Sequence, residues 1–402
     1  MLGILAGTAV GIGLGAASGL TPGVHANTMA GFLLAVQGLL LPLFGPETVA
    51  VAMFAALVTH TFLDIIPSTF LGIPDPDTAL SVLPAHAFCL AGKGEEAVRI
   101  SALGSAYASL LALPLSLVFI LLLPSVQPII DWGIGLVLLL AGGLLIVYSD
   151  SPSWSLAVFL VSGALGVFSF HYAFLGWHTA GMSSVLMPLL SGLFGISVLL
   201  SASHGMIPEQ HWDGHSWSMR TIVRHTGIGA VAGACVGWLP GLSNATANAV
   251  LQSAVSSDHD PGGYIIATSA ANTANAFLSL AALFALSRMR NGVMAALASQ
   301  DLPGIDVLLL GGMMAALCGY MLTVRLSRLA RKFNGIPVRR LSTLVIVLVI
   351  VLTVVLCGPF GLCILALATA VGSVPPLVNV RRVACMGAVM IPVMLYSFGF
   401  PV

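Results

Sequence analysis

Charged residues are scarce in this sequence, at 7% of 402 residues, and the formal net charge is zero. A soluble globular protein carries roughly a quarter of charged residues, so this composition excludes an ordinary water-facing surface. Hydrophobic residues make up 58% of the chain, and the mean hydropathy is +1.04. These values indicate a protein whose solvent is the lipid bilayer, and we expect no nucleic-acid partner.

Paired cysteines are also lacking. The six cysteines are scattered singly through apolar segments, without the close spacing of a metal or redox site. We interpret them as small core residues. The sequence shows no convincing set of nucleophile or metal ligands, so we expect no enzyme, no catalytic residue, no metal and no cofactor, with a coupling Na+ or H+ as the one exception.

Long apolar runs determine the fold class. Residues 102–123, 133–148 and 341–357 are apolar on every face, whereas the strands of a membrane barrel alternate. Because backbone groups in lipid must be satisfied internally, we predict an all-α, polytopic integral membrane protein with about 11–14 transmembrane or re-entrant helices. Two of these are expected over 97–123 and 132–148, with a break between them.

Basic residues predict the orientation. Twelve of the fourteen lysines and arginines lie within 93–99, 220–224, 325–340 and 381–382. If residues 287–300 re-enter without crossing, an even number of helices separates each cluster from the next, so all four can be cytoplasmic. We therefore expect a multi-pass protein of a prokaryotic cell membrane, with basic loops in the cytoplasm and the N-terminus outside.

A short motif occurs twice. Residues 18–31 read SGLTPGVHANTMAG and residues 236–249 read VGWLPGLSNATANA, and both follow G-x-x-P-G-x-[HS]-x-x-T. We infer an internal duplication. The loops that follow the two copies are expected on opposite sides, so the repeats would be inverted in topology, which places a binding site between them at the middle of the membrane.

The duplication predicts four regions. Residues 1–124 would form the first membrane repeat, with a broken helix and a re-entrant hairpin. Residues 125–219 would be connecting helices and a cytoplasmic loop. Residues 220–324 would form the second repeat, and 325–402 a basic loop followed by C-terminal helices.

Each motif would break a helix. Proline removes a backbone donor and glycine permits unusual backbone angles, and the half-helix that follows carries partial positive charge at its N-terminus, suited to a carboxylate or phosphate. The alternative is a simple kink in a packed helix. The candidate substrate-binding residues here are Pro22, Gly23, His25, Asn27, Thr28, Pro240, Gly241, Ser243, Asn244 and Thr246.

Ionisable residues in the first repeat are candidates for ion coupling. His60 and Asp64 are spaced i,i+4 in an apolar segment, where such residues are costly and usually functional. Alternatively, Asp64 hydrogen-bonds the backbone near Pro67. Asp75 and Asp77 lie in a proline-rich stretch that is typical of a hairpin tip, where Asp77 could simply cap the next helix.

Polar residues in the second repeat are further candidates for substrate binding. Asn272 and Asn275 lie on the apolar helix SAANTANAF, where their amides need a ligand or a partner on another helix. Arg288 and Arg290 would clamp an anion if they line a cavity, and would be ordinary interfacial residues if the helix ends earlier.

Four stretches together resemble the TctA family, the large membrane subunit of tripartite tricarboxylate transporters. They are the two G-x-x-P-G motifs; STFLGIPDPDTALSV with CLAGKGEEAVRISALGS; MPLLSGLFGISVLL; and SAANTANA. The sequence departs from the family pattern where Asp75 replaces a glycine and Ser269 replaces a glutamate, and the second hairpin's Gly-Ile-Pro-Gly is absent.

The resemblance implies an inverted-repeat transporter for a small carboxylate, driven by a cation or proton gradient. It implies two partners, a small membrane subunit and a periplasmic, extracytoplasmic binding protein. It also adds Gly72 and Pro74 to the substrate region. The other function that we consider is translocation of a polyprenyl-phosphate lipid carrier, for which the anionic ligand would be a lipid phosphate. A pocket open sideways to lipid would favour the lipid carrier, and a sealed one a soluble anion.

Overall fold

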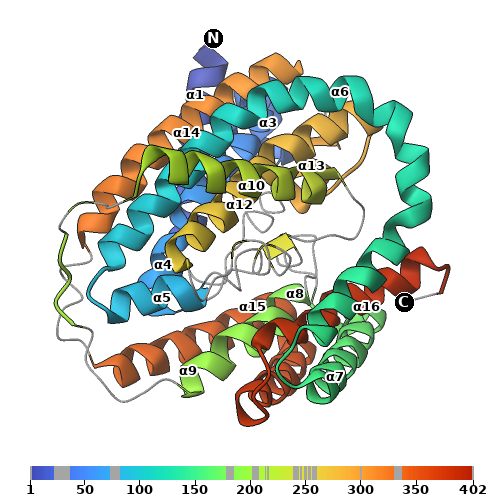
Figure 1. Ribbon diagram of the computed structural model, residues 1–402. Coiled ribbons are helices and arrows are strands. Elements are labelled where there is room, and N and C mark those ends of the chain that lie inside the picture. Colours follow the sequence, from blue (N-terminus) through green and yellow to red (C-terminus); the bar gives the residue numbers. More distant parts are fainter. Residues whose placement is uncertain are drawn as a thin grey trace.

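In the computed structural model every regular element that is described is helical, and the chain forms two groups of helices joined by one long helix (Figure 1). The structure describes residues 2–21, 37–72, 82–177, 185–201, 208–212, 214, 217–238, 244, 247–248, 251, 255, 260–298, 301–329 and 337–400.

The larger group contains the helices of both predicted repeats. These are α1 (Leu2–Leu20), α3 (Gln37–Leu63), α4 (Ile65–Leu71), α5 (Val82–Leu90), the first part of α6 (Gly94–Val147), α10 (Met219–Trp238), α12 (Pro261–Leu286), α13 (Gly292–Ala298) and α14 (Ile305–Ser327). The smaller group contains the end of α6, α7 (Pro152–His171), α8 (Leu186–Leu190), the π-helical segment η3 (Ser191–Ile196), α9 (Ser197–Ser201), α15 (Val338–Gly372) and α16 (Gly387–Ser397).

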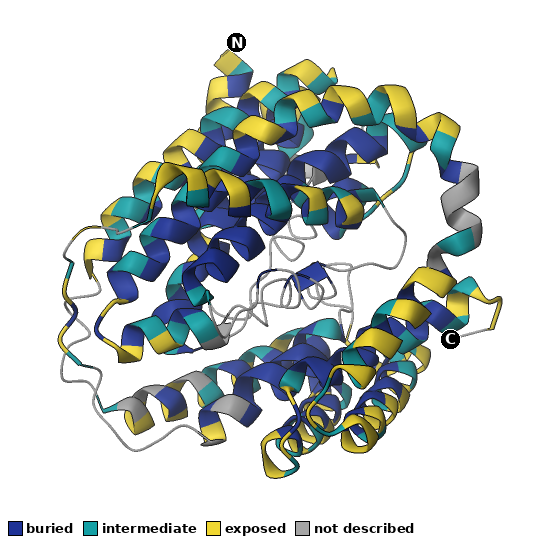
Figure 2. Ribbon diagram, in the orientation of Figure 1, coloured by how far each residue is buried: buried dark blue, intermediate teal, exposed yellow. Residues whose placement is uncertain are grey.

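Seven helices in the described part are long and apolar enough to cross a membrane, which confirms a polytopic membrane protein. Exposed leucines and valines lie along α6, α7 and α15, and Figure 2 marks exposed positions on the ribbons of these helices. A bilayer is the solvent that such surfaces require. The short helices α4, α5 and α13 cannot cross alone, and α13 lies in the segment 287–300 that was expected to re-enter.

The predicted break between 123 and 132 is wrong. Helix α6 runs without interruption for 54 residues, a length of ~80 Å at 1.5 Å per residue. The helix passes through Pro124 and Pro128, because a membrane helix tolerates proline where neighbours satisfy the freed backbone groups. The expected boundary between residues 124 and 125 therefore falls inside a helix.

Two long helices are interrupted, each at a glycine followed by proline. Gly45 interrupts α3 with φ 75°, and Gly358 interrupts α15 with φ 67°. Both angles are in the region that glycine alone adopts without strain.

Glycines spaced four apart bring the first two helices of each repeat into backbone contact. A methyl group on Gly15 of α1 would lie 2.5 Å from the Ala56 carbonyl oxygen of α3, and Gly233 of α10 meets the Ala271 carbonyl oxygen of α12 in the same way. Small residues at such spacing let membrane helices approach closely. The two helix pairs are therefore built alike.

This matching contact reveals a second stretch of the duplication. Aligning the two helices by their glycine contacts places AALVTHTFLD of α3 on AANTANAFLS of α12. The identical pairs are Ala55 and Ala270, Ala56 and Ala271, Phe62 and Phe277, and Leu63 and Leu278.

The repeats exchange their third helices. Helix α6 of the first repeat packs on α10 and α12, and α14 of the second repeat packs on α1 and α3. Gly104 of α6 abuts Ile266, and Gly311 of α14 abuts Val51. The duplication is therefore an interlocked unit rather than two bundles side by side.

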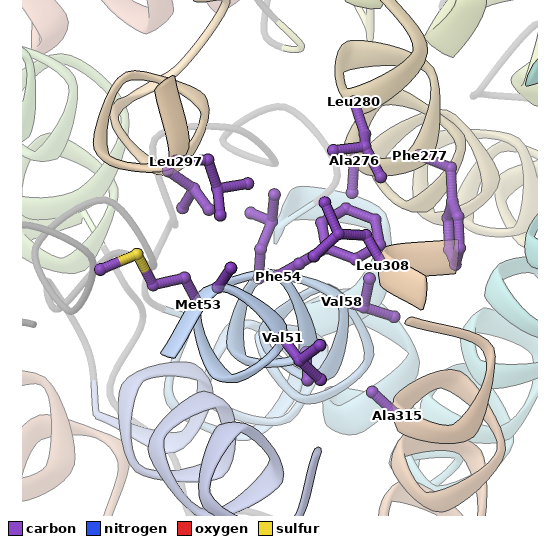
Figure 3. Packing of buried hydrophobic residues seen from close by; sticks show 14 of the residues in the cluster. Val51, Met53, Phe54, Val58, Ala276, Phe277, Leu280, Leu297, Leu308 and Ala315 are labelled. Atoms are coloured by element: carbon purple, nitrogen blue, oxygen red, sulfur yellow. The ribbon is translucent and has the colours of Figure 1, made fainter. Parts of the chain in front are cut away.

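Helices α3 and α12 cross in opposite directions at the centre of this unit. Phe54 meets Phe277 edge-on with ring centroids 5.5 Å apart, while Thr61 bonds Thr273. In these two contacts the residue number increases along α3, from 54 to 61, and decreases along α12, from 277 to 273. The equivalent helices are therefore antiparallel, as inverted repeats require. Figure 3 shows the apolar core on one side of this crossing, where Leu308 and other side chains of α14 join it.

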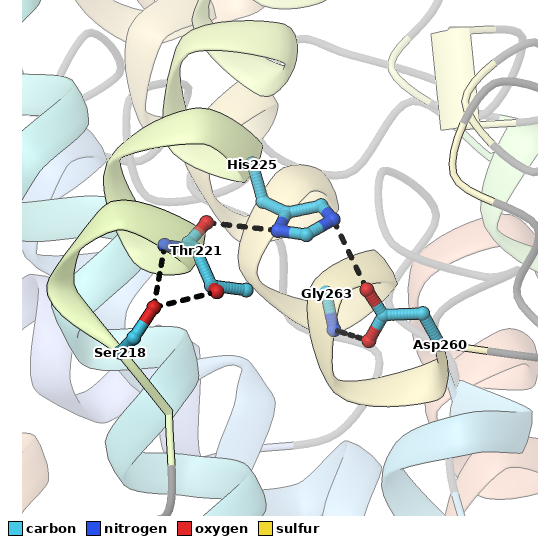
Figure 4. A network of polar contacts seen from close by, with 5 residues as sticks. All are labelled: Ser218, Thr221, His225, Asp260 and Gly263. Carbon is cyan, nitrogen blue, oxygen red and sulfur yellow. Dashed lines mark hydrogen bonds and ion pairs between the residues drawn. The ribbon is translucent and has the colours of Figure 1, made fainter.

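A carboxylate fixes the start of α12. Asp260 caps the helix by accepting a hydrogen bond from the Gly263 N–H at 2.8 Å, and its other oxygen lies 3.1 Å from His225 Nε2 of α10 (Figure 4). An N-cap stabilises a helix by ~1 kcal/mol. The contact with His225 also ties α12 to α10 at this end.

Candidate functional site

Eight predicted site residues fall within the described part of the chain: His60, Asp64, Gly72, Asn244, Asn272, Asn275, Arg288 and Arg290. The others lie outside the described residues: Pro22, Gly23, His25, Asn27, Thr28, Pro74, Asp75, Asp77, Pro240, Gly241, Ser243 and Thr246. Their roles stay predictions.

Three of the eight form a buried hydrogen-bond chain between the repeats. Asn272 Nδ2 on α12 donates to Asp64 Oδ2 at 2.8 Å, and Asn244 Nδ2 donates to Asn272 Oδ1 at 2.9 Å. Asp64, Asn272 and Asn244 are 4%, 4% and 2% exposed. The chain thus links an ionisable residue of the first repeat to the second Pro-Gly motif.

The geometry of Asp64 separates the two interpretations of this residue. Asp64 lies where α3 passes into α4, and its side chain makes no capping hydrogen bond to α4. Its carboxylate instead contacts α12, in the opposite repeat. Removing a carboxylate from water costs several kcal/mol unless charge-assisted hydrogen bonds replace hydration, and the Asn272 amide supplies one of them.

His60 lies one turn before Asp64, and its Nδ1 is 3.0 Å from Ser18 Oγ of α1. The residue is 2% exposed. Ser18 opens the first copy of the repeated motif, so His60 connects that copy to the helix that carries Asp64.

Hydroxyl pairs that the sequence did not single out line the same interface. Thr61 Oγ1 donates to the Val58 carbonyl oxygen at 2.8 Å, so the 3.0 Å contact between Thr61 and Thr273 has the Thr273 hydroxyl as donor. Ser101 of α6 bonds Ser269 of α12 at 2.8 Å. Ser269 was noted as a departure from the family pattern, and the sequence signal of the others was a small hydroxyl in an apolar helix, which is common in membrane proteins.

Arg290 contacts α10 two residues before Trp238, its last described residue. Its Nη2 donates to the Val236 carbonyl oxygen at 2.7 Å. Burial and the neighbouring charge of Arg288 lower the pKa of Arg290 to about 10, so the guanidinium stays charged at neutral pH. The structure therefore shows Arg290 in contact with the backbone of α10. Binding of a substrate anion by Arg288 and Arg290 stays a prediction.

Two further candidates have local structural partners. Asn275 Oδ1 accepts from the Ser279 hydroxyl at 2.9 Å on its own helix, at the positions equivalent to His60 and Asp64. Gly72 ends α4 in the left-handed region with φ 65°, next to the His86 ring. Within the described ranges no three His, Cys, Asp or Glu side chains gather to hold a metal.

Comparisons with known proteins cover almost the whole chain. The sequence model of the family described as "Tripartite tricarboxylate transporter TctA family" matches residues 5–387. An uncharacterized protein of Methanocaldococcus jannaschii is 27% identical over 293 residues, which cover 71% of this chain and 70% of that protein. No solved structure matches.

Proposed function

Because this chain belongs to the tripartite tricarboxylate transporter TctA family, we propose that it is the subunit that moves a small organic carboxylate across a cell membrane, coupled to H+ or Na+. The family is one of transporter components, and the seven candidate spans fit that role. The family match gives no support to the lipid-carrier alternative, and no described contact favours it.

The observation that carries the proposal is the chain from Asp64 through Asn272 to Asn244. A coupled transporter needs an ion-binding group whose state the substrate site can sense. Asp64 is the acid of this chain, and Asn244 belongs to the motif proposed to bind the anion. An acid buried between two antiparallel repeats meets the requirement for a coupling ion near the middle of the membrane.

Membership in a tripartite family also supports the expected partners. We propose a small membrane subunit beside this chain and an extracytoplasmic binding protein that delivers the carboxylate. The orientation proposed from the basic clusters, with residues 301–306 outside, would place the loop before α14 on the side from which the binding protein delivers the anion.

The test is uptake of radiolabelled di- and tricarboxylates into proteoliposomes under an imposed proton or sodium gradient, beside a flipping assay with a lipid phosphate. Asp64→Asn should abolish gradient-driven accumulation and keep counterflow. Asp306→Asn is the matched control, because Asp306 is exposed at the start of α14. Flipping without carboxylate uptake would overturn the proposal.

A further inference from the structure

We infer that the Asp64–Asn272–Asn244 chain is a proton-operated polarity switch. Protonation of Asp64 reverses both amides, so that Asn244 offers N–H donors instead of a carbonyl oxygen to the anion. The inference deepens the function proposed above and rests on it, and it selects H+ as the coupling ion.

The ionised state fixes the direction of the whole chain. A carboxylate only accepts hydrogen bonds, so Asn272 must present its amide N–H to Asp64, and does so at 2.8 Å. The carbonyl oxygen of Asn272 then faces Asn244, which must donate in turn. Asn244 is left with its Oδ1 pointing away from the chain, buried and without a hydrogen-bond partner among the described residues.

Protonation permits the reverse direction. With the proton on Oδ2, Asp64 donates to the Asn272 carbonyl oxygen once that amide has turned over. Asn272 then donates to Asn244 Oδ1, and the Asn244 amide nitrogen takes the place that its oxygen held. The amide oxygen and nitrogen are nearly equal in size, so the reversal needs a rotation about one bond and no repacking. The proton enters and leaves at Asp64 alone.

The reversal changes what an anion meets. A buried carbonyl oxygen repels a carboxylate, whereas an amide N–H binds it. The switch gives Asn244 Oδ1 a partner and turns the Asn244 N–H groups to the place that the oxygen held, so these N–H groups are satisfied only when the anion accepts from them. Proton and anion therefore favour each other's binding, and by linkage the anion raises the affinity of Asp64 for the proton by the same factor.

The surroundings of Asp64 leave few other titratable groups to explain a pH effect. Helices α1 and α12 carry no charged residue, and His60 is the titratable neighbour on α3. Helix α4 also packs on α5, α6 and α15. The charged groups and histidine of these segments are His86, Glu95, Glu96, Arg99, Arg339 and Arg340, and Arg99 pairs with Glu95 at 2.7 Å. Helix α14, which packs on α3, adds Asp306 and Arg325, and α12 adds Tyr264.

Citrate counterflow in proteoliposomes, with succinate as the dicarboxylate probe, tests the switch across a pH series. In the wild type the apparent affinity should fall about tenfold per pH unit above the pKa of Asp64, since one proton is linked to one anion. Asp64→Asn places a donor against Asn272, so binding should be tight at every pH. Asn272→Ala should make binding weak and independent of pH.

An infrared titration reads the proton directly. The carboxylic-acid band of Asp64 is identified by its loss in Asp64→Asn, and citrate should raise its titration midpoint in the wild type but not in Asn272→Ala. Thr268→Val is the control on the same helix, because the Thr268 hydroxyl bonds only carbonyl oxygens of its own helix in the described structure. This variant should behave like the wild type in both assays.

The outcomes separate the two proposals. If the wild type exchanges neither citrate nor succinate, carboxylate transport itself fails. If exchange is present but its pH dependence or the infrared shift survives in Asn272→Ala, the switch is overturned and transport stands. Sodium-dependent, pH-independent binding also overturns it. Should Asn272→Ala not fold, Asn244→Ala tests the other amide and should bind citrate weakly at every pH.

Discussion

Arg290 donates to the carbonyl oxygen of Val236, the oxygen that an unbroken helix would satisfy with the N–H of residue 240. Residue 240 is proline and has no N–H to give. In the first repeat the equivalent oxygen belongs to Ser18, four residues before Pro22, and accepts from the Thr21 N–H at 3.3 Å. The two repeats thus satisfy the same orphan carbonyl group with different donors.

Replacing this arginine should weaken its contact with the C-terminal part of α10. Arg290→Met keeps the length of the side chain and removes the charged hydrogen bond, which is worth about 1.5–3 kcal/mol. We expect a lower free energy of unfolding in nanodiscs. Arg340→Met is the control, because Arg340 is exposed, and an equal loss of stability in both variants would contradict a stabilising role of this contact.

The glycine contact of α1 should not tolerate a methyl group. Gly15→Ala would force α1 away from the Ala56 carbonyl oxygen, and such overpacking costs about 1–3 kcal/mol. Gly13→Ala, on the same helix with open space beside it, should be neutral or slightly stabilising. Thermal unfolding of the two variants in lipid would distinguish them, and equal midpoints would refute the close approach.

The bond between Asp64 and Asn272 should appear as a non-additive effect on stability. Asn272→Leu leaves a buried carboxylate without one of its donors, a loss of about 1.5–3 kcal/mol for a hydrogen bond to a charged group. Asp64→Leu combined with Asn272→Leu should cost less than the sum of the single changes. Asp64→Leu with Thr268→Val should be additive, and additivity in both cycles would show that Asp64 and Asn272 are not coupled.

The antiparallel crossing predicts a specific cross-link. Cysteines replacing Thr61 and Thr273, whose oxygens are 3.0 Å apart, should be bridged by Hg²⁺ in a background without the native cysteines. A protease site inserted after the exposed Gly214 would separate the two repeats, and the bridge would hold the fragments together on a gel. Thr59→Cys with Thr273→Cys should not bridge, because Thr59 faces Gly15 of α1.

The sequence predicted the fold class and much of the symmetry, because composition and the repeated Pro-Gly motif are local signals. The sequence analysis missed the match of α3 with α12. Equivalent positions there differ in polarity, such as Leu57 and Asn272, and this obscures the shared phenylalanines Phe62 and Phe277. It also divided α6 at prolines, since a sequence does not show which neighbours satisfy the backbone there.

The candidate site was predicted residue by residue but not as a connected whole. His60, Asp64 and Asn272 were costly in lipid and so conspicuous. Their connections depend on which helix of one repeat lies against which helix of the other. The bond from Ser18 to His60 joins a motif residue to the adjacent helix, and nothing in the spacing of these two residues predicts it.

The exchange of third helices bears on how this chain is made. Helix α3 is synthesised early, yet the surface that covers it on one side belongs to α14, which leaves the ribosome only after the second repeat is nearly complete. His60 has its partner Ser18 on the preceding helix α1, but Asp64 must face lipid or the insertion machinery until α12 brings Asn272 to it. Neither repeat can mature first, so biogenesis, like the interlocked architecture itself, requires both copies to assemble together.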